Sequence, residues 1–156
     1  MRIKLIAVGT KMPVWVNQGV EEYTKRLPRE WAFKIAEVPL AKRPKNYSPA
    51  VVQASESKHV AEVLDSKARS VVLDVTGKAV STEQLAQQLQ KWQEDARDVE
   101  ILVGGPDGFT RDFVTSCDQR LSLSALTLPH PLVRLLLAEQ LYRAWSVNAG
   151  HPYHRA

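Results

Sequence analysis

The sequence predicts an α/β domain, with a mainly parallel β-sheet and helices on both of its faces. Strand-like and helix-like segments alternate along the 156 residues, as they do in layered α/β domains. Two segments, "SVVLDV" and "VEILVGG", are almost unbroken apolar runs, which are typical of strands buried on both faces of a parallel sheet. The length suits a single domain over residues 1–156 with a sheet of about five strands.

The amino-terminal half is expected to contain two strands and two helices. The segment "RIKLIAVGT" is typical of a strand that ends at Gly9, and apolar residues at helical spacing follow it over residues 16–27. The segment "WAFKIAEVPL" predicts a second strand, which presents three apolar residues on one face: Trp31, Phe33 and Ile35. Ser48, with the proline after it, predicts the start of a helix that runs to about residue 66.

The carboxyl-terminal half is expected to alternate three strands with helices. After "SVVLDV", Ser81 and Gln84 form a capping-box pattern that opens a helix, and "VEILVGG" follows as the next strand. A short helix from about Thr110 and a strand "RLSLSALTL" come next, and a last helix is expected from about Pro131 to Trp145. Since ligands of such folds bind at the carboxyl ends of the strands, the loops after these three strands are candidate sites.

The last helix is apolar over more than half of its girth, which predicts burial on two sides. One stripe and its flanks contain ten apolar residues: Val133, Leu136, Leu137, Leu141, Ala144, Trp145, Leu132, Leu135, Ala138 and Tyr142. In a domain of this size, we expect the second side to pack against another subunit.

The charge distribution indicates the class of binding partner, and the cysteine content indicates the cellular compartment. The formal net charge is +4, and residues 1–45 contain ten Lys/Arg against four Asp/Glu. This basic segment suggests an acidic partner, with nucleic acid as the first candidate, although a solvated surface explains it too. A single cysteine, no export signal and no apolar run of about 20 residues predict a cytoplasmic protein without a membrane partner. Cys117 is expected to be a small buried residue of the short helix, and not a nucleophile.

The stretch "ILVGGPDGF" places Gly104, Gly105 and Gly108 directly after a strand. A phosphate cradle is excluded, because the Lys and Ser/Thr of a P-loop are absent and the glycine spacing of a dinucleotide fingerprint is wrong. Pro106 also removes an amide donor, and Asp107 adds a negative charge. A tight turn and a seat for another kind of ligand both remain open.

Two histidine-containing segments are further candidates. In "LSLSALTLPHPL", His130 stands between two prolines that fix its presentation, although a half-buried strand and a rigid helix start explain the same residues. The tail "HPYHRA" gathers His151, Tyr153, His154 and Arg155, where a disordered terminus is the ordinary expectation. No metal is predicted, because the histidines have no partner ligands at a suitable spacing.

Together these segments resemble the ribosomal RNA large subunit methyltransferase H family of the SPOUT class. The resemblance runs nearly end to end, through "AVGTKMP", Trp15, "GK" at 77–78, "RDVEILVGGPDG", "SLSALTLPHPLVRLLLAEQLYRAWS" and "HPYHR". It implies a carboxyl-terminal trefoil knot, a homodimer formed through the last helix, and methyl transfer from S-adenosylmethionine (AdoMet) to N3 of a pseudouridine in 23S rRNA, on assembled ribosomes. The cofactor residues that it implies are Leu73, Gly104, Leu123, Ser124, Ala125, Leu126, Thr127 and Leu128.

Chemistry assigns further roles to the remaining candidates. We expect Arg155 to offset developing charge or hold a phosphate, Tyr153 to stack on or hydrogen-bond the base, and His154 to assist. His130 is the alternative group for removing the N3 proton. Phosphate contacts are expected from six basic residues: Lys25, Arg26, Arg29, Lys42, Arg43 and Lys45.

Two other classes of protein fit parts of the sequence. A nucleotide-dependent oxidoreductase would use a doubly wound sheet, but the fingerprint is missing. A non-catalytic, ribosome-associated RNA-binding protein would explain the basic segment without any cofactor.

Overall fold

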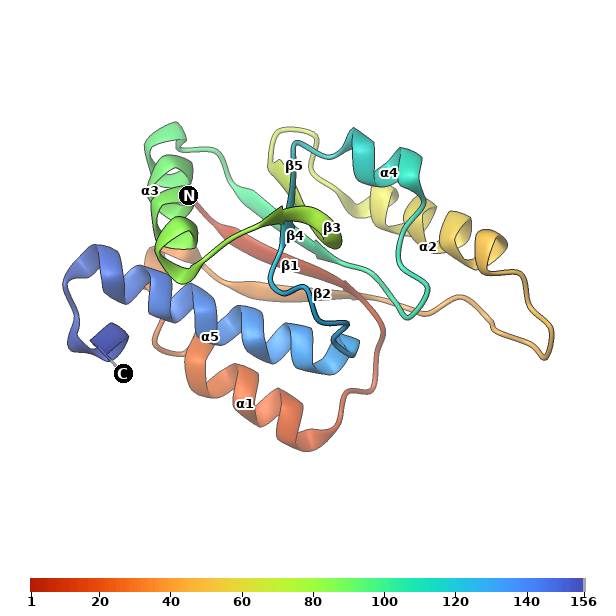
Figure 1. The fold of residues 1–156 in the computed structure, drawn as a ribbon, viewed down its shortest axis with the longest axis horizontal. Coiled ribbons are helices and arrows are strands. Elements are labelled where there is room, and N and C mark those ends of the chain that lie inside the picture. Colours follow the sequence, from red (N-terminus) through yellow and green to blue (C-terminus); the bar gives the residue numbers. More distant parts are fainter. Residues whose placement is uncertain (156) are drawn as a thin grey trace.

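A computed structural model describes residues 1–155 of the chain (Figure 1). The sheet has five parallel strands in the order β2-β1-β4-β3-β5, which confirms the predicted fold class. The strands are β1 (Ile3–Val8), β2 (Lys34–Val38), β3 (Arg69–Ala79), β4 (Val99–Val103) and β5 (Gln119–Ser122). Because all strands are parallel, their carboxyl ends meet at one edge of the sheet.

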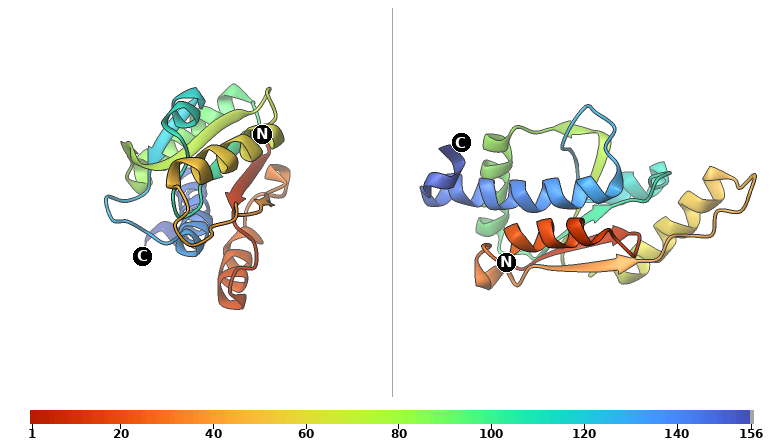
Figure 2. Two further views of the ribbon diagram at one scale, coloured as in Figure 1. Left: turned by 90° about the vertical axis from the view of Figure 1, so that its right-hand side faces the viewer. Right: turned by 90° about the horizontal axis from the view of Figure 1, so that it is seen from below.

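Helices cover both faces of the sheet. The five α-helices are α1 (Val14–Thr24), α2 (Pro49–Val63), α3 (Thr82–Asp95), α4 (Arg111–Ser116) and α5 (His130–Ala149), and two short 3₁₀ helices are η1 (Arg29–Trp31) and η2 (Pro152–Arg155). In Figure 1, α1, α3 and α5 lie on one side of the sheet and α2 and α4 on the other. The right-hand view of Figure 2, which looks at the molecule from below, shows α1 and α5 running side by side in front of the sheet.

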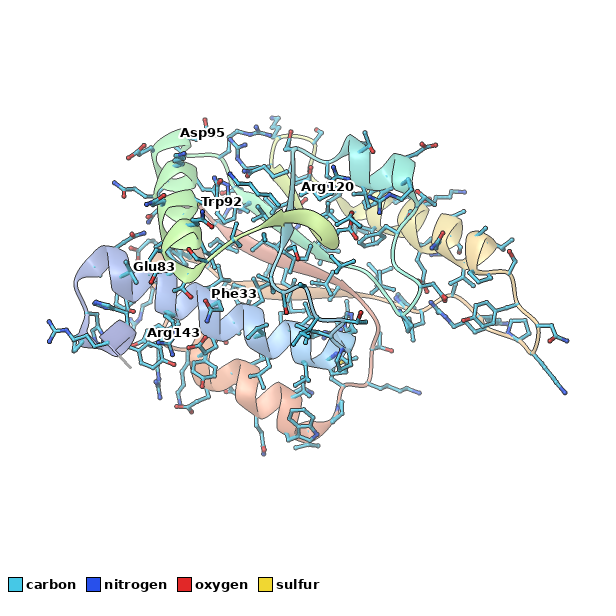
Figure 3. The ribbon with its side chains drawn as sticks, viewed as in Figure 1. Phe33, Glu83, Trp92, Asp95, Arg120 and Arg143 are labelled. Carbon is cyan, nitrogen blue, oxygen red and sulfur yellow. The ribbon has the colours of Figure 1, made fainter. Side chains whose placement is uncertain are left out.

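Alternate residues of the strands build two separate cores. In β1, Ile3 and Leu5 face α3 and α5, whereas Ile6 and Val8 belong to the cluster under α2 and α4. All five residues of β4 are buried, as expected for a central strand covered on both faces. Trp92 of α3, labelled in Figure 3, is 1% exposed, and its indole N–H donates to Gln119 Oε1 over 2.7 Å.

The capping signal of α3 is confirmed. Ser81 accepts a hydrogen bond from the backbone N–H of Gln84, and the Gln84 side chain returns one to the Ser81 backbone. The α5 helix ends at Gly150, whose φ of 67° lies in the left-handed region that glycine adopts without strain. The α5 helix runs one turn beyond its predicted end at about Trp145.

Three sequence expectations are wrong in detail. Trp31 lies in η1, not in a strand, because the chain turns at Ala32 with a φ of 43° before β2 begins. The expected strand "RLSLSALTL" is extended only over β5, and the residues that follow are irregular, since this edge strand pairs with β3 alone. Cys117 follows the last residue of α4 and is half-buried, and burial raises the pKa of its thiol.

A register shift in β3 brings it close to β5. The pairing with β5 breaks between Leu73 and Lys78, and a Cβ atom on Gly77 would lie 2.7 Å from the carbonyl carbon of Leu121. Such a contact requires glycine. The threading of the knot implied by the resemblance stays a prediction. Among residues 1–155, no helix is long and apolar enough to cross a membrane.

Candidate active site

A cavity of about 770 Å³ opens at the carboxyl edge of the sheet. Its walls come from Leu73, Asp74 and Val75 at the register break within β3, the turn after β4, the loop after β5 and the first turn of α5. Of the three loops that the sequence singled out, those after Val103 and around Leu128 contribute walls, whereas β3 continues to Ala79, so no loop follows Leu73. Seven of the eight predicted cofactor residues line the cavity, and they are Leu73, Gly104, Leu123, Ser124, Leu126, Thr127 and Leu128. Ala125 lies in the same loop but does not line the cavity.

The turn after β4 is both a tight turn and a wall of the cavity. The backbone N–H of Gly108 donates to the carbonyl of Gly105 over 3.0 Å, and Gly108 has a φ of 73°. A Cβ atom on Gly104 would lie 3.3 Å from the Phe109 ring, and one on Gly105 would lie 2.9 Å from Glu56 Oε1. Glycine at both positions therefore lets the backbone itself form the wall.

The loop after β5 offers backbone groups and apolar side chains to a ligand. Ser122 donates through its hydroxyl to the carbonyl of Ser124, and the Ser124 hydroxyl accepts from the backbone N–H of Leu126. These bonds fix an irregular segment. Leucine side chains on such a fixed backbone form the kind of apolar slot that a flat heterocycle occupies.

Buried charges hold the first turn of α5 against the sheet. Arg134, which is 2% exposed, donates to His130 Nε2 over 2.8 Å, to Glu37 Oε2 over 2.7 Å and to the carbonyl of Gly9 over 2.7 Å. His130 Nδ1 lies 3.0 Å from the carbonyl oxygen of Gly104. Burial lowers the pKa of His130, and the charge of Arg134 acts in the same direction.

A second buried network ties the basic loop before α2 to the turn after β4. Arg43 donates to both carboxylate oxygens of Glu56, at 2.9 and 3.1 Å, and to Asp107 over 3.1 Å. Asp107 also accepts from the Tyr47 hydroxyl, and its carbonyl accepts from Gln53. Hydrogen bonds with Glu56 are the main cause that raises the pKa of Arg43.

This network changes the interpretation of Arg43, which the sequence suggested as a phosphate contact. Its guanidinium is only 17% exposed and is occupied by Glu56 and Asp107, so it is a structural residue of the loop. Lys42 and Lys45 on either side are exposed. Their loop extends beyond the sheet at the edge that contains the cavity (Figures 1 and 2).

The other predicted RNA contacts lie elsewhere. Lys25 and Arg26 both pair with Glu22 near the end of α1, and Arg29 is exposed on η1. The guanidinium of Arg26 also lies 5.7 Å from the centre of the Tyr142 ring, beside the carboxyl-terminal tail. The six basic residues therefore form two groups, of which only the first adjoins the cavity.

The tail forms η2 and packs on the second half of α5. The Tyr153 hydroxyl donates to Glu139 Oε1 over 3.1 Å, and Arg143, labelled in Figure 3, lies over the Tyr153 ring at 5.0 Å. Burial and the Glu139 carboxylate raise the pKa of Tyr153 to about 12, so its hydroxyl is a donor at neutral pH. His154 contacts the carbonyl of His151.

Within one chain, the tail and the cavity lie apart. The residues that hold Tyr153 follow His130 by nine to thirteen positions along α5, which corresponds to roughly 14–20 Å of helix. The structure thus brings His130 to the predicted cofactor residues, but not Tyr153, His154 or Arg155.

An apolar groove lies on the outward side of α5, where the sequence predicted a second buried face. It has a volume of about 510 Å³ and is lined by Tyr23, Leu128, Leu132, Leu135, Leu136, Glu139, Arg143 and Tyr153. Leu132 is 40% exposed in the chain as described. Trp15, 55% exposed, stands on the side of α1 that also carries Tyr23 two turns later.

Sequence reasoning missed the buried Arg134 and Glu56, and the half-exposed Glu37 that pairs with Arg134. Arg134 interrupts the apolar stripe of α5 one turn after His130, and that interruption was the available signal. Glu37 and Glu56 gave no comparable signal, because their partners are distant in the sequence. Over residues 1–155, no cluster of three or more His, Cys, Asp or Glu side chains is arranged to bind a metal ion.

Comparison with known families places this fold and its cavity in a class of methyltransferases. The sequence model of the family described as "Predicted SPOUT methyltransferase" matches residues 1–154. Curated proteins named "Ribosomal RNA large subunit methyltransferase H" from Hahella chejuensis and Saccharophagus degradans are each 52% identical to the chain, over 99% of its length and 99% and 100% of theirs. The chain therefore belongs to the ribosomal RNA large subunit methyltransferase H family, which confirms the resemblance seen in its sequence.

The Arg43 network predicts a difference in stability between neighbouring basic residues. Arg43→Ala would leave Glu56, which is 0% exposed, buried without its cation, and should lower the free energy of unfolding by about 3–5 kcal/mol. Lys45→Ala should change it by less than about 0.5 kcal/mol. Urea denaturation of the two variants measures the difference, and equal midpoints would contradict the structural role of Arg43.

Proposed function

We propose that this protein transfers a methyl group from AdoMet to N3 of a pseudouridine in the large-subunit rRNA of assembled ribosomes. The observation that carries the proposal is the cavity at the carboxyl edge of the sheet, lined by the loops that the resemblance assigns to the cofactor. The names of the relatives support the substrate class. We further propose that residues 1–156 act as one domain in the cytoplasm.

AdoMet suits the size and the charge of the cavity. The volume lies within the range of small-molecule sites, and the leucine-rich loop would hold the adenine by apolar contact and backbone hydrogen bonds. Two carboxylates, Asp74 and Asp107, line the wall, and neither the wall nor the turn offers an anion cradle. Burial opposes the ionisation of Asp74, but hydrogen bonds from Thr76 and Arg111 outweigh it and lower its pKa. Asp74 pairs with Arg111 and Asp107 with Arg43, so both carboxylates are already neutralised, and apolar and backbone contacts would hold AdoMet.

The protein's main contribution to the reaction is alignment. AdoMet supplies a methyl group that its sulfonium already activates, so the chain must hold the base nitrogen in line with that methyl. The N3 proton passes to water, and negative charge develops on the base oxygens until the new N3–methyl bond forms, as the methyl–sulfonium bond of the donor would break to leave its thioether. A cation or a hydrogen-bond donor beside those oxygens stabilises this charge. Arg155 and the protonated Tyr153 hydroxyl are the proposed groups, with His154 assisting.

These groups would reach the cavity of a second copy of the chain. The tail of one chain packs about 14–20 Å along α5 from its own cavity. The apolar groove on the outward side of α5 begins at Leu128, which also lines the cavity, and ends at Tyr153. A second α5 docked in this groove would bury exposed leucines and could bring each tail to the partner's cavity. This geometry supports a homodimer formed through α5.

RNA would approach the edge of the sheet that contains the cavity. Lys42 and Lys45 project from a loop that Arg43 and Tyr47 fix to the turn after β4. Such a loop would hold phosphates at a constant distance from the cofactor. Arg26 and Arg29, near the tail, would contribute to the same surface if the tail belongs to the partner's cavity.

Methyl transfer from labelled AdoMet to ribosomes that lack the modification tests the proposed function. We expect label in the large-subunit rRNA, at N3 of a pseudouridine after nuclease digestion and mass spectrometry. Deletion of residues 151–156 should lower turnover by about 100-fold or more while leaving AdoMet affinity unchanged, because the tail acts on the base. Undiminished activity after the deletion would refute the role of the tail. RNA binding without any methyl transfer would favour a non-catalytic factor.

The groove predicts the effect of a charge on the dimer. Leu132→Glu should yield monomers in light scattering and abolish methyl transfer, because a carboxylate would be buried in an apolar interface. Val63→Glu is the matched control, since Val63 is 49% exposed on α2, which contributes no residue to the groove, and should remain dimeric.

Mixed dimers test the exchange of tails. A tail-deleted chain and a Gly104→Val chain are each expected to be inactive, the second because its side chain would clash with Phe109 and obstruct the cavity. Co-refolded, they should regain activity, since the intact cavity would receive the intact tail. No recovery in verified mixed dimers would place the tail in its own chain's site.

The exposed lysines predict a change in salt dependence. The double variant Lys42→Ala, Lys45→Ala should weaken ribosome binding and reduce the slope of log affinity against log salt by about 1 per lysine removed. The control variant Lys67→Ala, Lys91→Ala removes the same charge from exposed positions on other loops and helices. If both double variants retain the wild-type slope, the loop does not contact phosphates.

A further inference from the structure

The buried Arg134 joins four parts of the fold beside the cavity. From the first turn of α5 it donates to His130, to Glu37 of β2 and to the carbonyl of Gly9 after β1, and His130 in turn contacts the carbonyl of Gly104 after β4. Gly104 lines the cavity, and so does His130. The side chains of His130 and Arg134 therefore connect the wall of the cavity to the ends of three strands.

The donors in this arrangement determine the protonation of His130. A guanidinium has no acceptor, so Nε2 of His130 must accept the hydrogen bond from Arg134 Nε. The carbonyl oxygen of Gly104 can only accept a hydrogen bond. Nδ1 of His130 must therefore carry a proton and donate it to that oxygen. The imidazole is thus neutral, protonated at Nδ1, and its Nε2 lone pair is occupied. A general base needs a free lone pair, which neither nitrogen provides here.

We propose that His130 and Arg134 are positioning residues, which hold the Gly104 wall in the shape that binds the methyl donor, and that the donor site requires a neutral His130. The proposal rests on the proposed function, because the affinity of the protein for AdoMet is one of the measurements that test it. It assigns His130 a role different from proton removal. A protonated imidazole would turn an N–H toward the Arg134 guanidinium and bring two positive charges together, which would break the link.

The direction of the pH effect follows from the surroundings of His130. Burial is the main cause that lowers its pKa, Arg134 lowers it further, and the Gly104 carbonyl and Glu37 oppose both. A histidine whose folded pKa is lowered stabilises the structure above its unfolded pKa of about 6.5, and this contribution is lost as the pH falls through the folded value. Binding of the methyl donor AdoMet should therefore weaken as the pH falls below about 6.5.

Calorimetric titration of AdoMet without RNA tests the proposal. At pH 7.5, His130→Ala and Arg134→Lys should weaken binding by about tenfold, the effect of one lost buried hydrogen bond. The wild-type affinity should fall toward that of His130→Ala as the pH is lowered from 7 to 5, while His130→Ala stays flat. Unchanged affinity in both variants, with a slower single-turnover methyl transfer in His130→Ala, would overturn the proposal in favour of a general base.

Nitrogen NMR of the wild-type histidines gives a second readout that requires no variant. We expect His130 to show a protonated Nδ1 and an unprotonated Nε2 at neutral pH, and the opposite tautomer or an imidazolium would overturn the proposal. If the wild-type protein does not bind AdoMet, the proposed function fails. In that case two other measurements test the hydrogen-bonded link from Arg134 through His130 to Gly104. They are the tautomer of His130 and a loss of thermal stability at acid pH that is absent in His130→Ala.

Discussion

The pairing of β4 with β1 on one side and β3 on the other determines the position of the sheet edge at which the cavity opens. This strand is buried at all five positions, and its registers with both neighbours are unbroken. Lys4 and Glu100, which face each other across the β1–β4 pair, also form an ion pair with a nearly buried carboxylate. Because the three strands are parallel and in register, Gly9 after β1, the break in β3 after Leu73 and the turn after Val103 lie at the same edge of the sheet.

Two buried charge networks then hold the turn after β4 from opposite sides. Arg134 acts through His130 on the carbonyl of Gly104, and Arg43 acts directly on Asp107. A buried ion pair contributes little net stability once desolvation is subtracted, but it disfavours arrangements that leave one charge unpaired. The networks thus favour one shape of a turn that, with its three glycines, is otherwise free to move.

The sequence predicted the layers of the fold because apolar runs and capping residues are local signals. The Ser81 capping box and the fully buried strands are examples. Its predictions were wrong where contacts between residues distant in the sequence determine the local structure. The loop after β5 has a strand-like alternation but no partner strand, and Trp31 is buried by a 3₁₀ turn that positive φ at Ala32 ends. The cofactor loops followed from the resemblance, whereas the pairing of Arg43 with Glu56 could not be read from spacing.

The hydrogen bond from Arg134 to the carbonyl of Gly9 joins residues 125 positions apart. A chain emerging during its own synthesis therefore has all strands of the sheet before it has a complete cavity. Residues 123–134 follow every strand of the sheet in the sequence, and they supply the last wall of the cavity and the Arg134 link. Contacts of such long range also slow folding. The donor site is in this sense completed only after every strand of the sheet has been synthesised.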